Sequence, residues 1–549
     1  MAVTPIKTPF SKMSFTPDVP SSALGPQEYN AGQNIETNVR GINSVAGDAY
    51  ILSEIPGNPI FVTSGFGIDN VFWFIVATEQ GNWYAINISG ITDVTPAFGT
   101  FTGYSTSTVI TASWNGNVVF LNDQLNPPMY FAPGQWGQIR LYDNAPDNYV
   151  WNYDLGYNAS GNVVPLYSSL TAGFMRVYNS PNVGSLLIAG NLTGDINANV
   201  VPGGGTVQNL PTTVRWSQNF GLNSGPTTWE PTISNVANEV EIPVRGPVID
   251  GFSLNGNFYA FSYWDCVLFS PIAYTSTSAP VFGISLVTQG RGLLNENCWA
   301  VVDNIAMGVD ARDIWSFNGG AFTPLGDQRI KDYFFSNLNA NYTNQVFMIN
   351  NTHKYQIEIY YPDLNSAGQC NQMISYRYDL DVWNPPRQVS FATMACEAPN
   401  IQNGVFNLAT RGVVYSSFNN VDNTQANVQL VQKDTGTSFL DGAVISSLFQ
   451  RNNISFGQDY SASIQVHRVY PEIYGSGEID ITVGGADSVA SPPAYEATET
   501  MQIVTNNPWV QIDQNEARIT SIKVSANSAV DSWQMTAANW QITKVQDTR

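Results

Sequence analysis

The sequence predicts an all-β protein with three parts: a β-propeller-like domain with inserted loops, a C-terminal antiparallel β-sandwich and an extended N-terminal arm. Charged residues make up only 12% of the 549 residues, about half the usual share. The polar surface must therefore come from Asn, Gln, Ser, Thr and Gly, which suit turns and strands better than helices. Aromatic residues also reach 12%, as expected for broad packed sheets. Short apolar runs bounded by Asn-Gly or Gly-Gly turns recur along the chain.

Residues 1–45 are the predicted arm. Prolines recur through this segment, and a proline cannot donate to a sheet ladder and favours extended backbone. An extended chain with spaced apolar residues can lie along a partner's surface and become ordered there. A disordered terminus is the alternative. The candidate partner-docking residues of the arm are Phe10, Met13, Phe15 and Tyr29.

Residues 46–440 are predicted to form the propeller-like domain. The stretch "NVFWFIVATEQGNWYAINI" (70–88) contains an apolar run, a turn and an alternating run, and "DIWSFNGGAFTPLG" (313–326) repeats this shape. Such paired strands resemble propeller blades, of which we expect six or seven; a pair of β-sandwiches is the runner-up. The Asn-, Gly- and Pro-rich region 145–213 is expected to form long loops inserted between blades. Residues 327–338 are the best candidate for a short helix.

Residues 441–549 are predicted to form a separate β-sandwich or jelly roll. The segment "ASIQVHRVYPEIYGSGEIDITVGG" (462–485) alternates apolar and polar residues, as does the final stretch 517–545. Alternation of this kind is typical of antiparallel sheets with one buried face.

The charge balance limits the kinds of partner. The chain has 22 basic and 43 acidic residues, a net charge of −21, which argues against binding nucleic acid by neutralising its phosphates. A surface past which DNA slides without sticking stays compatible. There is no apolar run of 18 residues, so no membrane-spanning segment is expected. The first twenty residues lack the apolar segment of a secretory signal.

The residue types that carry chemistry are sparse. The four cysteines, which have no Cys-x-x-Cys spacing, are expected to be buried free thiols made in a reducing cytoplasm. The two histidines are expected to be structural. A glycosidase needs two carboxylates at the scissile bond, and Asp265, Asp313 and Asp381 lie beside tryptophans. However, aspartates next to turns commonly cap backbone amides, and the Ser-x-Asp-x-Gly-x-Thr-Trp box of sialidases is absent. We therefore predict no enzyme activity, no cofactor and no metal site.

One charged cluster, "DARDIW" (310–315), directly precedes a predicted hairpin. It is either an active site on a β-scaffold or the corner of one blade. The second interpretation is simpler: Arg312, between Asp310 and Asp313, forms a local ion pair.

Several phrases follow one another along the chain, among them "RVYNSPNVGSLLIAGN", "VRWSQNFGLNSGPTTWEP" and "GLLNENCWAVVDNIAMGVDARDIWSFNGGAFTPLGDQRIKDYFFSNL". In this order they resemble the tail nozzle, tail hub or tail-stabilisation proteins of short-tailed bacteriophages (podoviruses). The resemblance covers nearly the whole chain. It is one of layout and turn phrases with no single diagnostic motif, and the region 145–213 is its least typical part.

The resemblance implies a structural virion protein without catalytic activity. Copies would form a ring, usually a homo-hexamer, beneath the portal and the adaptor. The ring would enclose the channel through which double-stranded DNA leaves and would carry tail fibres or spikes. The protein would be assembled in the cytoplasm of the bacterial host and reside in the virion tail. The alternative is a tail protein that binds or cleaves host-surface glycans.

Overall fold

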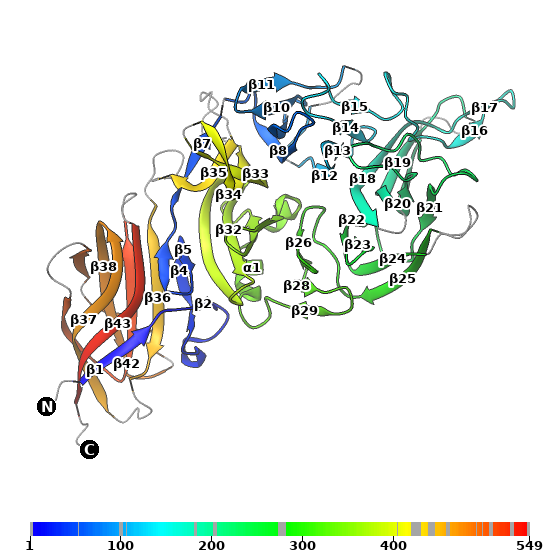
Figure 1. The fold of residues 1–549 in the computed structure, drawn as a ribbon. Helices are drawn as coiled ribbons and strands as arrows, with labels where there is room; N and C mark the ends of the chain where they lie inside the picture. Colours follow the sequence, from blue (N-terminus) through cyan, green and yellow to red (C-terminus); the bar gives the residue numbers. More distant parts are fainter. Residues whose placement is uncertain are drawn as a thin grey trace.

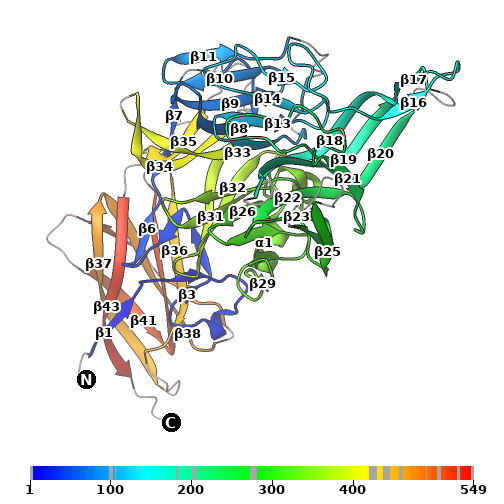
Figure 2. The ribbon, with the colours of Figure 1, turned by 45° about the vertical axis from the view of Figure 1, so that its right-hand side comes forward.

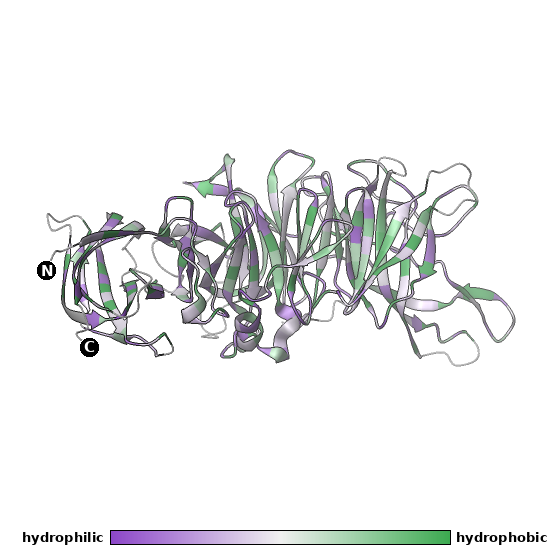
Figure 3. Cartoon of the chain, turned by 90° about the horizontal axis from the view of Figure 1, so that it is seen from below, coloured by the Kyte–Doolittle hydropathy of each residue, from purple (hydrophilic) through white to green (hydrophobic). Residues whose placement is uncertain are grey.

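The computed structural model describes residues 4–545, apart from 53, 98–102, 106, 181–183, 201–205, 273–280, 403, 419–429, 437–444, 457–461, 490, 497, 504–508 and 528–531. The described chain is almost entirely antiparallel β-sheet, which confirms the predicted all-β class. A propeller-like ring of six sheets lies beside a β-sandwich, and both ends of the chain lie at the sandwich (Figure 1). Figure 3, a view from below, shows that the molecule is elongated in the direction that runs from the sandwich to the ring.

Five sheets of the ring have four strands each, in sequence order, and several neighbouring strands are joined by tight turns. The turn between the first two strands of the fourth sheet shows why: Asn255 (φ 52°) and Gly256 (φ 76°) supply the left-handed backbone of a two-residue hairpin. The first sheet consists of β8 (Pro59–Phe66), β9 (Phe72–Thr78), β10 (Trp83–Asn87) and β11 (Gly90–Asp93); the second of β12 (Thr111–Asn115), β13 (Val118–Asn122), β14 (Met129–Phe131) and β15 (Arg140–Leu141); the third of β18 (Tyr167–Ser180), β19 (Gly184–Ile196), β20 (Val207–Trp216) and β21 (Asn238–Glu241); the fourth of β22 (Val248–Leu254), β23 (Asn257–Ser262), β24 (Asp265–Pro271) and β25 (Phe282–Gln289); and the fifth of β26 (Trp299–Val302), β27 (Ile305–Val309), β28 (Ile314–Phe317) and β29 (Phe322–Pro324).

The sixth sheet has seven strands and ends on a strand from the start of the chain. A short helix, α1 (Lys331–Asn337), and a 3-10 turn, η2 (Ala340–Gln345), precede it, which confirms a short helix within the predicted range 327–338. In spatial order the strands are β30 (Phe347–Asn351), β31 (Gln356–Tyr361), β32 (Cys370–Arg377), β33 (Val382–Gln402), β34 (Val405–Ser417), β35 (Leu430–Gly436) and β7 (Gly47–Ile51).

Apolar side chains close the six sheets into a ring, because each sheet packs its faces on both neighbours. For example, Phe261 of the fourth sheet stacks on Trp315 of the fifth, with ring centroids 5.7 Å apart. The last and first sheets share a cluster that contains Phe74, Cys396 and Val414. The Ser64 hydroxyl of β8 also donates to the Glu397 carbonyl of β33 (2.8 Å). Side-chain packing therefore closes the circle.

The third sheet differs from the prediction of long loops in the region 145–213. Much of that region is strand: β18, β19 and β20 extend beyond the other blades, and a small hairpin, β16 (Leu155–Tyr157) with β17 (Val163–Pro165), is carried at their end (Figure 2). One of the prolines of this region, Pro211, stands inside β20. It lies opposite Asn191 (φ 57°), where the register between β19 and β20 shifts, and a bulge tolerates a residue without a donor.

The sandwich consists of two sheets, each with strands from both ends of the chain. The first contains β41 (Val510–Ala517), β37 (Ser463–Ser476), β43 (Ser532–Val545), β6 (Ile42–Ser44) and β5 (Ile35–Thr37), with β1 (Thr4–Pro9) also paired to β43; the second contains β39 (Ala494–Tyr495), β38 (Glu478–Ala486), β42 (Ile519–Ala526), β36 (Ser447–Ile454) and β4 (Ala31–Gln33), with β40 (Glu499–Gln502) on β38. The predicted arm therefore supplies four strands of this sandwich. A short parallel pair, β2 (Ser14–Phe15) and β3 (Glu28–Tyr29), and a 3-10 turn, η1 (Ser21–Ala23), complete the arm.

Candidate functional site

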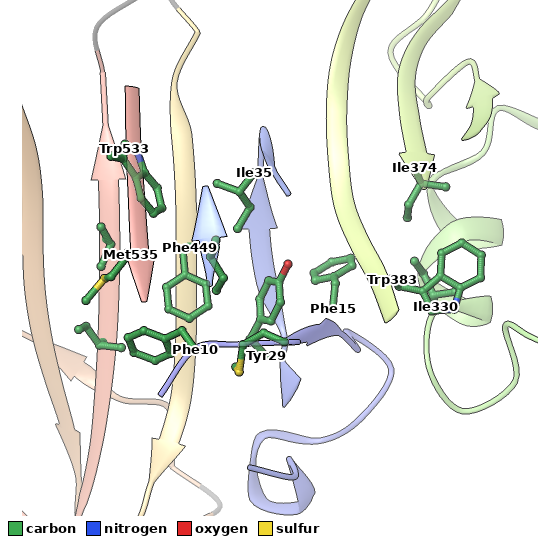
Figure 4. Close-up of a cluster of buried hydrophobic side chains, with 14 of the residues drawn as sticks. Phe10, Phe15, Tyr29, Ile35, Ile330, Ile374, Trp383, Phe449, Trp533 and Met535 are labelled. Atoms are coloured by element: carbon green, nitrogen blue, oxygen red, sulfur yellow. The ribbon is translucent and has the colours of Figure 1, made fainter. Parts of the chain in front are cut away.

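The four predicted docking residues lie inside the chain's own core, so the expectation that they face a partner is corrected. Phe10, Met13, Phe15 and Tyr29 are at most 1% exposed. In Figure 4, Phe10 lies among the sandwich strands, and Tyr29 and Phe15 follow in the direction of the ring. The rings of Phe10 and Tyr29 each meet Phe449 of β36 with centroids 5.2 Å apart. The spacing of the anchors was recognised, but their partner is the C-terminal half of the same polypeptide.

The arm connects the sandwich to the ring through Phe15. Its ring lies 5.7 Å from Tyr29 on the sandwich side and 5.4 Å, edge-to-face, from Tyr333 of α1 on the ring side. The adjacent Ser14 hydroxyl accepts the backbone N–H of Trp383 at the start of β33 (3.2 Å). Aromatic pairs of this geometry stabilise beyond the area they bury. The arm therefore holds the two domains together.

Buried charged residues near the four arm residues form a second connection between the ring and the sandwich. Arg387 of β33 (2% exposed side chain) pairs with Asp48 of β7 at 2.5 Å and with Asp434 of β35. It also donates to the Ala46 carbonyl (2.9 Å). Burial works to raise the pKa of Asp434, but Arg387, Lys354 and Lys433 outweigh burial and hold that pKa well below its usual range.

The same network extends in two directions from Asp434. Lys354 pairs with Asp434 (2.7 Å) and with Glu36 of β5 (2.8 Å), so it ties the ring to the sandwich strand. Lys433 pairs with Glu358 at 2.8 Å, and both side chains are fully buried. Charges taken out of water need such partners, because removing one partner leaves the other uncompensated. The network is therefore a structural connection between domains, with the carboxylates held in ion pairs.

A second polar cluster lies where the inner strands of four successive sheets meet. Arg176 of β18 makes a bidentate pair with the fully buried Asp250 of β22 (2.9 and 2.5 Å). It also donates to the Ala112 carbonyl of β12 (2.8 Å) and to the Glu296 carbonyl before β26 (3.0 Å). The indole of Trp299 on β26 donates to Asp250 (2.7 Å). Arg176 and Asp250 thus fix four sheets around one point.

Glu296 contributes a second carboxyl to this cluster, beside that of Asp250. Its carboxylate accepts a hydrogen bond from the amide of Gln124 (2.9 Å). Burial raises the pKa of Glu296 to about 7, against that hydrogen bond and with support from the nearby Asp250. This group therefore changes charge near neutral pH inside the ring.

The "DARDIW" cluster is a blade corner, but its ion pairs differ from the prediction. Arg291 bridges Asp310 and Asp313, at 3.2 Å from each. Arg312 instead donates to the Gly290 carbonyl, and its backbone N–H is accepted by Asp310 (2.7 Å). The expected Arg312 pair is wrong, because the turn directs that side chain to the neighbouring strand connection.

The carboxylates considered for glycosidase chemistry are each held by an arginine. Asp265 pairs with Arg245 (2.6 Å), Asp313 with Arg291, and Asp381 with Arg329 (2.8 Å). Asp381 also accepts the Tyr376 hydroxyl (2.8 Å). A carboxylate fixed in this way caps and braces the fold.

The histidines and cysteines have separate surroundings. His467 contacts the Thr543 hydroxyl (2.8 Å), and His353 is exposed. The four cysteines are free and buried, and burial raises the pKa of each thiol: Cys266, Cys298, Cys370 and Cys396. Within the described residues, no group of three His, Cys, Asp or Glu side chains is placed to hold a metal ion. Across the same residues, no helix combines the length and apolar character needed to cross a membrane.

A surface cavity of about 360 Å³ lies beside the second sheet. Trp136 and Arg140 line it, but the Arg140 guanidinium covers the Trp136 ring at 4.0 Å and pairs with Asp147 (2.5 Å). These side chains are therefore engaged with one another.

Comparisons with known proteins leave the family open. No family model matches the chain, and no curated protein matches it. Among solved structures, the chain is similar to the computationally designed Ika8 protein at 10% sequence identity, over 70% of this chain and 98% of that chain, with a TM-score of 0.33. A likeness at this level carries no argument about function.

Proposed function

We propose that this protein is a structural component of a short-tailed phage virion, a subunit of the tail nozzle or hub that assembles with copies of itself around the DNA exit channel. The observation that carries the proposal is the use of the buried charges. Arg387, Lys354 and Arg176 form ion pairs that join different strands, sheets and domains of the same chain. A rigid two-domain unit of this kind suits a building block under load.

The centre of the ring also favours assembly of several copies. Arg176, Asp250 and Trp299 meet there from different sheets. A duplex-sized passage would consequently have to lie between copies of the chain. This fits the sequence resemblance, which implies a ring of usually six subunits.

The net charge supports a channel that DNA passes without binding. A net charge of −21 repels phosphates, because 43 acidic residues outnumber 22 basic ones. Some of these basic residues are already neutralised within the chain: the side chains of Arg176, Lys354, Arg387 and Lys433 each pair with a carboxylate of the same polypeptide. The protein is expected not to retain duplex DNA at physiological salt.

The adaptor would have to dock on a surface other than the four buried arm residues. Since Phe10 and Tyr29 are already buried in the sandwich, truncating residues 1–30 would unfold that domain as well as affect any attachment. Attachment of the adaptor and of fibres or spikes is therefore better tested with surface substitutions.

The test is to purify the full chain and image it, alone and with a phage portal–adaptor complex. The proposal expects closed rings of several copies, coaxial with the adaptor, and no change in host-surface polysaccharide incubated with the protein. Stable monomers that shorten a polysaccharide would contradict it and favour the glycan-directed tail protein.

A further inference from the structure

The β16–β17 hairpin has its apolar residues on the outside. Leu155 lies opposite Pro165, and Tyr157 lies opposite Val163, so all four share one face. Leu155 and Tyr157 are 65% exposed and Val163 is 56% exposed. The opposite face carries Gly156, which lies against Val200 and Leu166. A hairpin with only a structural role would place polar residues outward, so this inverted pattern needs a partner.

The hairpin is held in one conformation before any partner arrives. The Asn158 side chain accepts the backbone N–H groups of Ser160 (3.0 Å) and Asn162 (2.9 Å) at the turn. The Leu166 N–H donates to the Asp154 carbonyl (2.7 Å), and the Asn197 N–H donates to the Leu166 carbonyl (2.9 Å). A preorganised apolar face loses little conformational entropy when it is covered.

We propose that this outer face of β16–β17 binds a second copy of the chain. The inference rests on the proposed function for its partner, and it names the surface through which copies associate. Two molecules with a charge of −21 each repel one another, so they can meet most readily where charge is absent. Residues 155–165 contain no charged residue. A lipid surface is disfavoured, because the hairpin offers no Lys or Arg to anionic headgroups.

The chain also carries a suitable receiving surface. The turn between β33 and β34 and the strand ends beside it, residues 398–410, contain no charged residue. Two apolar side chains of this segment are exposed, Val405 (60%) and Leu408 (62%). Strands β33 and β34 lie on the sandwich side of the ring, whereas β16 and β17 form the opposite extremity in both views (Figure 1; Figure 2). Two different apolar surfaces at opposite sides make head-to-tail contacts, which close into a ring when the rotation from copy to copy permits it.

The hairpin is an anchor and not the whole interface. A face of four side chains offers a few hundred Å², roughly the size of the largest apolar patch on a typical monomer. A stable contact buries about 800 Å² on each partner. The surrounding surface at that end of the extended third sheet must supply the rest.

The test measures assembly mass by native mass spectrometry for the full chain and for two variants. Tyr157→Asp combined with Leu155→Asp should lower the assembled fraction at least tenfold at equal concentration, with an unchanged circular-dichroism spectrum. Tyr474→Asp, at a 62% exposed residue of the sandwich strand β37 and outside the third sheet, is the matched control and should assemble like the parent. A Tyr157→Cys, Leu408→Cys chain should form intermolecular disulfide ladders, since the native cysteines are buried.

The possible outcomes separate the hairpin contact from the proposed function. A parent that assembles together with a hairpin variant that assembles equally overturns the inference and leaves the proposed function standing. A parent that stays monomeric, also with portal–adaptor present, overturns both. Loss of assembly in the hairpin variant without a 157–408 cross-link supports the hairpin contact and overturns the head-to-tail arrangement. Hairpin-dependent sedimentation with phosphatidylcholine vesicles would assign the face to lipid and overturn the inference.

Discussion

Replacing Arg387 by Met should strongly destabilise the junction between the ring and the sandwich. The substitution keeps much of the side-chain volume but leaves Asp48, which is fully buried, without its ion-pair partner. Removing one member of a buried pair typically costs about 3–5 kcal/mol. Burial already raises the pKa of Asp48, and protonation of this carboxyl offers an escape. Measured against the unfolded chain, where the carboxyl has its ordinary pKa, that protonation costs about 4 kcal/mol at pH 7. Whether Asp48 stays charged and unpaired or becomes protonated, the expected loss in the free energy of unfolding is therefore similar.

The escape route predicts how the effect depends on pH. At pH 5 the same protonation costs only about 1.5 kcal/mol, so the gap between Arg387→Met and the parent should shrink there. Scanning calorimetry should show a Tm lowered by roughly 6–20 °C at pH 7, if the junction unfolds as a unit of about 200 residues. Adding Asp48→Asn should recover much of the loss, because Asn needs no cation.

The matched control is Arg411→Met. Arg411 is 57% exposed and lies 3.7 Å from Glu397, so its surface pair should contribute at most about 1 kcal/mol. An Arg387→Met protein that melts with the control at pH 7, or whose deficit is equal at pH 5 and pH 7, would refute this reasoning.

Three further predictions concern the ring centre, the arm and the surface charge. Because the folded-state pKa of Glu296 is raised to about 7, its contribution is full below the unfolded value near 4.3 and is lost as the pH rises through 7. Between pH 5 and pH 8, the Tm of Glu296→Gln should therefore fall by less than the Tm of the parent. The corresponding difference in the free energy of unfolding is on the order of 3 kcal/mol at most. Parallel curves of Tm against pH for the two proteins would contradict this prediction. Phe15→Ala should cost about 3–5 kcal/mol and expose the junction to proteolysis, whereas Phe66→Ala, at a 36% exposed position, should cost much less; equal cleavage rates would contradict the arm's role. Duplex DNA should not shift with the protein in a gel at 150 mM salt, and a micromolar complex would contradict the repelling surface.

Much of the fold was readable from the sequence because the blades depend on local patterns. The run 70–88 became β9 and β10 with the turn where Gly81 was expected, and "DIWSFNGGAFTPLG" became β28 and β29. Each hairpin is specified by residues close in sequence, through alternation and left-handed turn positions. The region 145–213 was expected to form loops because it is rich in Asn, Gly and Pro. A bulge accommodates Pro211 within β20, and only the pairing with the neighbouring strand reveals that bulge.

The candidate site could not be predicted in the same way, because its contacts join distant segments. Phe10 and Tyr29 were recognised as apolar anchors, but nothing local shows that Phe449, more than 400 residues away, receives them. Asp48, Arg387 and Asp434 come from three separate strands, so no spacing signals their pairing. The alternation of the C-terminal sheets did indicate a sandwich, yet not that the first residues complete it.

The most direct test of a self-assembling structural protein is the mass and shape of the purified full chain on mixing with a portal–adaptor complex. Electron microscopy and native mass spectrometry should together show one closed ring of several identical copies, coaxial with the adaptor. A population that remains at the 60.0 kDa of a single chain at every concentration, with or without the complex, would contradict the account.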